Sequence, residues 1–170
     1  MDNLSQGTIV LSLLSGVVGS VIGAVIGSWA TLRATKISLD GLYKQEKNRR
    51  KFESNQQNLV VMHSLLKELK ENESIANEVP NKAFKHVVMS REAWSIYKGS
   101  TSFMTKKLQT NLPYAYSLIS EYNSLLEYDK AYLSHGAGYH NDKIAAAAEK
   151  FKGNVGGVIA QLEDLLKEAG

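Results

Sequence analysis

The first part of the chain is a long run without charge. The stretch Thr8–Leu32, TIVLSLLSGVVGSVIGAVIGSWATL, has no charged side chain, and the uncharged run reaches back to Asn3. At about 1.5 Å of rise per residue, a helix over this stretch would measure roughly 37 Å, more than the ~30 Å hydrocarbon core of a bilayer. We therefore expect one slightly tilted transmembrane helix.

A cleaved signal peptide is the main competing interpretation of such a run. The residues before the run are acidic, at Asp2, rather than basic. The run is also longer than the roughly 7–15 apolar residues of a signal peptide, and no convincing small-x-small cleavage site precedes Arg33. The sequence therefore favours a retained signal anchor.

Small side chains gather on one side of this expected helix. At about 100° per residue they fall within one arc of about 120°; its members are Thr8, Ser12, Gly16, Gly19, Ser20, Gly23, Gly27 and Ala30. Gly19, Gly23 and Gly27 form two overlapping GxxxG steps, which let helix backbones approach closely in lipid. We expect a homo-oligomer, or alternatively a narrow polar lumen, built on Ser12, Gly16, Gly19, Gly23 and Gly27.

The charge that follows the run is strongly asymmetric. Seven basic residues lie between Arg33 and Phe52 against two acidic ones, Asp40 and Glu46. By the positive-inside rule this predicts a single-pass protein of the inner (cytoplasmic) membrane, with its N-terminus outside and its C-terminal domain in the cytoplasm. Trp29, one turn before Arg33, fits the aromatic belt at that boundary.

The basic cluster has two interpretations. We expect it to rest against anionic lipid headgroups, where each cation contributes about 1 kcal/mol, through Arg33, Lys36, Lys47, Arg49, Arg50 and Lys51. The alternative is a contact with nucleic acid, but the cluster lacks the interleaved aromatic residues that stack on bases.

The rest of the chain predicts a helical bundle. We expect a membrane anchor over residues 1–33, a basic juxtamembrane helix or linker over 34–58 and a cytoplasmic bundle over 59–170. Apolar residues recur at helical spacing, without strand alternation, in segments 59–79, 83–98, 108–133 and 144–169. The fold class is therefore all-α, with an antiparallel four-helix bundle after one transmembrane helix.

Particular residues refine this bundle. Glu68 and Asn72 lie at the border of an apolar face, where we expect them to form hydrogen bonds across the bundle. Ser90 is the cap of an alternative, shorter second helix that would begin at Arg91. The last segment carries a heptad seam made of Ile144, Ala148, Phe151, Val155, Val158, Leu162, Leu165 and Ala169.

The residues of common catalytic sites are missing. The chain has no cysteine and four histidines, and it contains no glycine-rich phosphate loop, GxSxG elbow or HExxH pair. His135, His140 and Asp142 lack a recognised metal-ligand spacing. We therefore expect no catalytic residues, no cofactor, no metal and no enzymatic activity.

Three short segments carry a resemblance, namely LLKELKEN (Leu65–Asn72), AWSIY (Ala93–Tyr97) and YSLISEYN (Tyr116–Asn123). The pattern resembles small prokaryotic proteins with one membrane helix and a cytoplasmic helical bundle, such as the membrane accessory protein of RNA-targeting type VI-B CRISPR systems. The resemblance implies an oligomeric membrane pore in antiviral defence and a bundle related to HEPN domains. No arginine is followed by a histidine at the four-to-six-residue spacing of HEPN ribonucleases.

Two functional hypotheses follow from the sequence. The first is a homo-oligomeric, pore-like membrane effector whose partners are copies of itself and the anionic bilayer. The second is a membrane-anchored adaptor whose bundle binds a protein or RNA partner.

Overall fold

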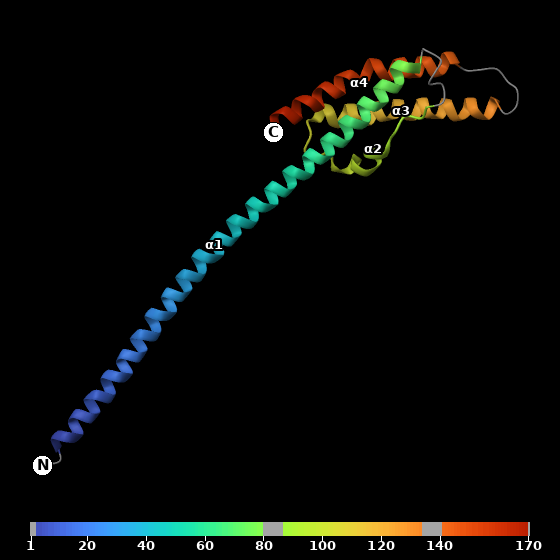
Figure 1. Cartoon of the computed structure of the whole chain (residues 1–170). Helices are drawn as coiled ribbons and strands as arrows, with labels where there is room; N and C mark the ends of the chain where they lie inside the picture. The colour runs from blue at the N-terminus through green and yellow to red at the C-terminus, as the bar shows by residue number, and fades with distance from the viewer. Residues whose placement is uncertain (1–2, 80–86, 134–140, 170) are drawn as a thin grey trace. The chain divides into compact units, whose positions relative to one another are not determined.

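The computed structural model is built from helices. It describes residues 3–79, 87–133 and 141–169, with side chains omitted for residues 3–17, 132–133 and 141. The elements in these ranges (Figure 1) are α1 Asn3–Glu78, α2 Glu92–Tyr97, the short 3-10 helix η2 Lys98–Ser100, α3 Lys106–Leu133 and α4 Asn141–Ala169. None of the described ranges contains a strand. The expected all-α class is confirmed.

The chain forms two compact units, residues 1–53 and 54–170. Helix α1 is a single element of 76 residues. The expected helical continuation beyond Arg33 is therefore present, and Gly41 lies inside the helix rather than at its end. The first unit consists of this helix alone among the described residues, so its side chains are exposed with the exception of the half-buried Glu46.

Among the residues that the structure describes, no helix is long and apolar enough to cross a membrane. Part of the expected span Thr8–Leu32 falls on residues 8–17, whose side chains lie outside the described part of the chain. From residue 18 to residue 32 the large apolar side chains are exposed. They are Val18, Val21, Ile22, Val25, Ile26, Trp29 and Leu32.

The second unit encloses one hydrophobic core. Helices α1, α3 and α4 each contribute fully buried side chains, among them Leu65, Leu69, Ile119, Leu126 and Phe151. In α1 the buried face centres on Leu65, and Leu59 and Leu66 are partly buried and pack against the core. An ion pair of 2.6 Å between Lys70 and Glu163 joins α1 to α4 at the surface.

The expected second helix over residues 83–98 is wrong for residues 87–91, the first described part of that range. Residues 87–90 are not helical, and α2 comprises six residues. The structure instead contains the shorter helix that the sequence offered as an alternative, beginning at Glu92, one residue later than expected, with Arg91 rather than Ser90 at the N-cap position. The physical reason is that the backbone N–H and C=O groups of Met89 and Ser90 form hydrogen bonds with side chains of α1 and α3 instead of with a helix of their own, as described below.

Helices α3 and α4 pack against each other along the second unit (Figure 1). The heptad seam of α4 is buried from Ile144 to Leu162, as predicted, and becomes partly exposed at Leu165. Pro113 lies within α3. On the outer side of α4, Gly153, Gly156 and Gly157 are exposed, and a Cβ added at any of them would meet no atom within 4 Å.

The seam predicts a large cost for truncating its aromatic residue. Phe151 is fully buried, so Phe151→Ala should lower the free energy of unfolding by about 3–5 kcal/mol through lost burial and a cavity. Urea denaturation followed by near-UV circular dichroism measures this loss. Tyr114→Ala removes an exposed aromatic from α3 and should change stability by less than about 0.5 kcal/mol; equal losses in both variants would contradict the assigned core.

Candidate functional site

The glycine face of α1 has no neighbour among the residues that the structure describes. A Cβ added at Gly19, Gly23 or Gly27 would meet nothing within 4 Å. The other two residues predicted for this face, Ser12 and Gly16, lie outside the residues whose side chains are described. The described glycines therefore leave room for another helix backbone to approach closely.

Trp29 and Arg33 form a pair at the end of the apolar stretch. The Arg33 guanidinium lies 5.4 Å from the centre of the Trp29 ring, a distance at which the ring quadrupole attracts the cation. Both residues are exposed. An aromatic ring covered by a cation suits a boundary between apolar and aqueous surroundings, where both side chains keep a polar end in water.

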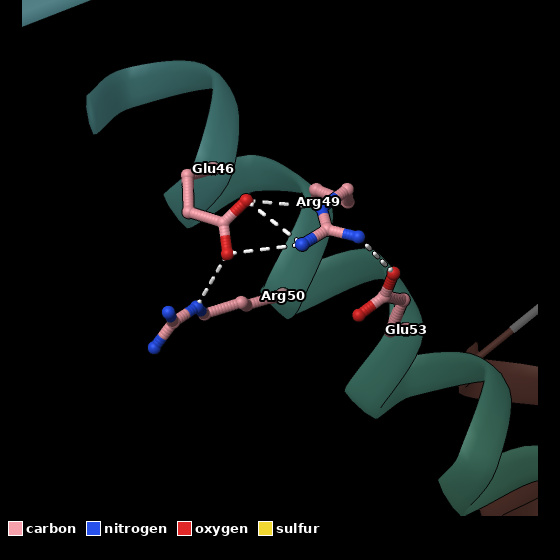
Figure 2. A network of polar contacts seen from close by, with 4 residues as sticks. All are labelled: Glu46, Arg49, Arg50 and Glu53. Carbon is pink, nitrogen blue, oxygen red and sulfur yellow. Dashed lines mark hydrogen bonds and ion pairs between the residues drawn. The ribbon is translucent and has the colours of Figure 1, made fainter. Parts of the chain in front are cut away.

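A network of four side chains occupies one side of α1 further along (Figure 2). Glu46 accepts hydrogen bonds from Arg49 Nε at 3.0 Å and from Arg50 Nε at 2.8 Å. A second nitrogen of Arg49 reaches the same carboxylate at 3.1 Å, and its third nitrogen reaches Glu53 at 3.2 Å. Two guanidinium groups are thus balanced by two carboxylates within one helix.

The other basic residues of this segment lie on a different side of α1. Within the described chain none of them forms an ion pair, and at about 100° per residue they share an arc of about 80° with Asp40. These residues, the basic stripe, are Arg33, Lys36, Lys44, Lys47 and Lys51. The six cations predicted to contact lipid therefore fall into two groups. Arg49 and Arg50 form ion pairs with carboxylates of the same helix, whereas the other four form no ion pair among the described residues.

Position along α1 separates these cations further. The polar headgroup layer is about 5–8 Å thick on each side of a bilayer. For a straight helix along the membrane normal whose span ends at Leu32, Arg33 and Lys36 lie at headgroup depth. Lys47 and Lys51 lie about 22 and 28 Å beyond Leu32 at the helical rise, which is outside the headgroup layer.

The network fixes the charge of its central carboxylate. Hydrogen bonds from Arg49 and then Arg50 lower the pKa of Glu46 from 4.5 to about 2. The same contacts raise the pKa of both guanidinium groups. Glu46 is therefore ionised at any physiological pH.

This geometry predicts how Glu46 titrates. Because the folded pKa is depressed, the network stabilises the helix above pH 4.5 and this contribution is lost as the pH falls through about 2. Removing a donor by Arg50→Ala should move the Glu46 midpoint upward, measured by carboxyl ¹³C NMR on labelled glutamate. Lys47→Ala, which removes a neighbouring cation outside the network, is the control; a Glu46 midpoint near 4.5 in the unaltered protein would contradict the network.

A second polar cluster lies inside the bundle and holds the backbone of residues 89 and 90. Asn72 of α1 accepts from the Ser90 N–H and donates to the Ser90 carbonyl, both at 2.8 Å. Asn123 of α3 does the same for Met89, at 2.9 and 2.8 Å. The Tyr122 hydroxyl donates to the Val87 carbonyl at 3.2 Å. We call these side chains, with Glu68, the polar clamp.

Glu68 completes the clamp at the start of α2. Its carboxylate, 5% exposed, accepts from the Ser90 hydroxyl at 2.8 Å and from the backbone N–H groups of Ala93 and Trp94 at 2.9 and 3.2 Å. The predicted cap, Ser90, accepts from the Glu92 N–H at a longer 3.3 Å. The expected hydrogen bonds of Glu68 and Asn72 across the bundle are confirmed, whereas sequence analysis missed the role of Asn123.

An aromatic pair covers the clamp. Trp94 stacks on Tyr116 with ring centres 4.7 Å apart and planes 8° apart. The Tyr116 hydroxyl is buried without a hydrogen-bond partner in the described chain. Burial is the main cause, and the nearby Glu68 carboxylate the second cause, of a raised pKa for this phenol.

The contacts of the clamp indicate its role. Asn72, Asn123 and Glu68 form hydrogen bonds with backbone groups or with the Ser90 hydroxyl, so these side chains position α2.

One open hollow lies elsewhere in the second unit. Its volume is about 370 Å³, and its lining includes Asn58, Leu59, Phe103, Leu165 and Glu168. Among the described residues no group of three histidine, aspartate or glutamate side chains is placed to hold a metal ion. His135 and His140 lie outside the described residues.

No protein-family model, curated protein or solved structure matches the chain. The three segments that carry the resemblance noted from the sequence do meet in space. Glu68 and Asn72 come from the first, Trp94 from the second and Asn123 from the third, and all of them belong to the clamp or cover it. All three segments therefore contribute to holding residues 89 and 90 and the start of α2 in place.

The clamp predicts a specific loss of stability. Asn72→Ala leaves the Ser90 N–H and carbonyl without partners, at a cost of roughly 1–3 kcal/mol for each group. The free energy of unfolding in urea measures this loss. Asn154→Ala removes an exposed asparagine bonded to the Lys150 carbonyl and should change stability by less than about 0.5 kcal/mol. Similar effects of both substitutions would contradict a clamp.

Proposed function

We propose that this chain is a membrane-anchored protein that self-associates through the glycine face of α1, with the second unit as its cytoplasmic bundle. The observation that carries the proposal is the exposure of every large apolar side chain in residues 18–32, between 53% and 70%. Such a surface is unfavourable in water and marks contact with lipid or protein. The uncharged residues before it lengthen the same apolar segment.

The ends of the segment support one orientation in the membrane. Arg33 and Lys36 follow the apolar residues directly, and Trp29 lies beneath Arg33. Basic residues are retained on the cytoplasmic side, and tryptophan is enriched at the interface. The proposed location is therefore the inner (cytoplasmic) membrane, with the C-terminal side in the cytoplasm.

Self-association is supported by the open glycines. In lipid, helices associate where small residues allow backbones to approach, and Gly19, Gly23 and Gly27 are unobstructed on one face. We propose further that the assembled helices enclose a narrow pore, used in antiviral defence as the resemblance implies. Serines on the same face would give such a pore polar groups.

Replacing the central glycine tests the assembly. A Leu side chain at position 23 fits the single chain, because nothing lies within 4 Å of its Cβ. Gly23→Leu should therefore leave the bundle folded and reduce the full-length protein in detergent to its monomer, measured by light scattering. Val25→Leu, on the opposite face, is the matched control and should keep the assembly size. An unchanged size in Gly23→Leu would contradict the glycine interface.

The pore has its own readout in the same proteins. The unaltered protein and Val25→Leu should release a small dye from anionic vesicles, and Gly23→Leu should not. If the protein assembles but releases no dye from the vesicles, the proposed pore is rejected and the proposed membrane anchor is retained.

A further inference from the structure

The segment 91–103 lies on the bundle without a buried side chain of its own. We call it the strap; it contains α2 and η2 (Figure 1). The residues at both of its ends are anchored: Met89, before it, is 1% exposed, and Met104, after it, is 4% exposed. Gln109 of α3 also donates to the carbonyls of Ser102 and Met104, at 3.1 and 2.8 Å. The strap is therefore a surface segment between two anchored points.

Two kinds of contact hold the strap between these points. The N–H groups of Ala93 and Trp94 donate to the Glu68 carboxylate at 2.9 and 3.2 Å. The Trp94 ring stacks on the ring of Tyr116 in α3. Ala93, Trp94 and Tyr97 pack against the core but are only partly buried. Glu68 and Tyr116 are therefore the main attachment points of the strap.

The closed strap leaves one polar group in an unfavourable place. The Tyr116 hydroxyl is buried and has no hydrogen-bond partner in the described chain. A buried hydroxyl without a partner has lost its bonds to water and gained none in return, so it raises the free energy of the closed state. The hydroxyl lies near the Glu68 carboxylate, to which the strap is bonded. Movement of the strap away from Glu68 would let water reach it.

We infer that the strap is a movable cover, which opens as a unit between Met89 and Met104 while the three long helices stay packed. The Glu68 hydrogen bonds and the Trp94–Tyr116 stack favour the closed state, and the buried Tyr116 hydroxyl favours the open state. A segment without fully buried side chains opens at a lower free energy than the core. Opening uncovers Glu68 and Tyr116, which are 5% and 1% exposed in the closed state. The inference concerns the second unit and does not depend on the membrane anchor.

Hydrogen exchange of the full-length protein in detergent tests separate opening. The Ala93 and Trp94 amides are bonded to a buried carboxylate, so they exchange slowly unless the strap opens. Read by mass spectrometry, they should exchange about tenfold faster than the amides of residues 115–126 in α3. Low urea should change their rate little, because opening of the strap exposes little surface. Equal rates for the two segments would show that the strap opens only when the bundle unfolds, and would overturn the inference.

Removing the charge of Glu68 tests the attachment. Trp29→Phe leaves Trp94 as the single tryptophan, so quenching of its fluorescence by acrylamide reports its exposure. In this background Glu68→Gln should raise the quenching constant about twofold, because an amide is a weaker acceptor than a carboxylate. Glu71→Gln, at an exposed site of the same helix, is the matched control and should leave the constant unchanged. Equal constants in the two variants would overturn the role of Glu68.

Tyr116→Phe tests the opposing contribution, because it keeps the stacked ring and removes the buried hydroxyl. It should favour the closed strap, lowering the Trp94 quenching constant and slowing exchange of the Ala93 and Trp94 amides about threefold. Tyr114→Phe, which removes the hydroxyl of an exposed tyrosine in the same helix, is the control and should change neither. Unchanged or greater quenching in Tyr116→Phe would overturn the opposing role of the hydroxyl.

The two substitutions together separate opening of the strap from unfolding of the bundle. Opposite effects of Glu68→Gln and Tyr116→Phe on Trp94, with unchanged exchange in α3, are the expected result. Parallel changes in the strap and in α3 would assign both effects to the stability of the whole bundle and overturn separate opening. If Glu68→Gln abolishes the near-UV circular dichroism of the bundle, exchange in the unaltered protein and in Tyr116→Phe decides the question.

Discussion

The backbone of Met89 and Ser90 must find hydrogen-bond partners in a helical bundle that offers no neighbouring strand. Buried peptide groups left unpaired are costly, and two asparagine side chains from different helices solve this requirement. Each carries a donor and an acceptor in one plane, as a peptide group does. Residues 89 and 90, which precede α2, are thereby tied to both α1 and α3, and Glu68 accepts the N–H groups of Ala93 and Trp94 at the start of α2.

Helix α1 meets a different constraint in the first unit, where it has no core to pack against. Its surface is divided by charge: a neutralised network, a basic stripe and an uncharged side run along the same turns. Local pairs at i, i+3 and i, i+4 support the helix by themselves. The basic stripe and the uncharged side take no part in these pairs, so their side chains are available for contacts outside the helix.

The spacing of apolar residues in the sequence predicted correctly which faces of the long helices are buried in the core. The seam of α4 and the cross-bundle role of Glu68 and Asn72 followed from spacing and from the cost of burying polar groups. The start of the second helix was not predicted correctly from periodicity. Val87 and Val88 fit a helical pattern, but hydrogen bonds with Asn72 and Asn123 hold the following residues, Met89 and Ser90, in a non-helical conformation. Asn123 gave no signal of its own, since a single asparagine on a long helix resembles a surface residue.

The candidate surface on α1 was only partly predictable. The spacing of Glu46 and Glu53 from Arg49 was visible in the sequence, yet the arginines were interpreted as lipid contacts because the cluster was treated as one group. Separating them required the side-chain geometry, which shows Arg49 and Arg50 already bonded to carboxylates. The expected contribution of Ser12 and Gly16 stays a prediction.

The three exposed glycines of α4 have a consequence for how the bundle moves. Each costs about 1 kcal/mol of helix stability relative to alanine, and no packing contact at these positions compensates. The helix is held by its buried seam, which weakens toward Leu165 and ends at the exposed Ala169. Local opening free energies follow buried contact, so we expect amide hydrogens in the last turns of α4 to exchange with solvent before those of α3, through opening of this end of the bundle without global unfolding.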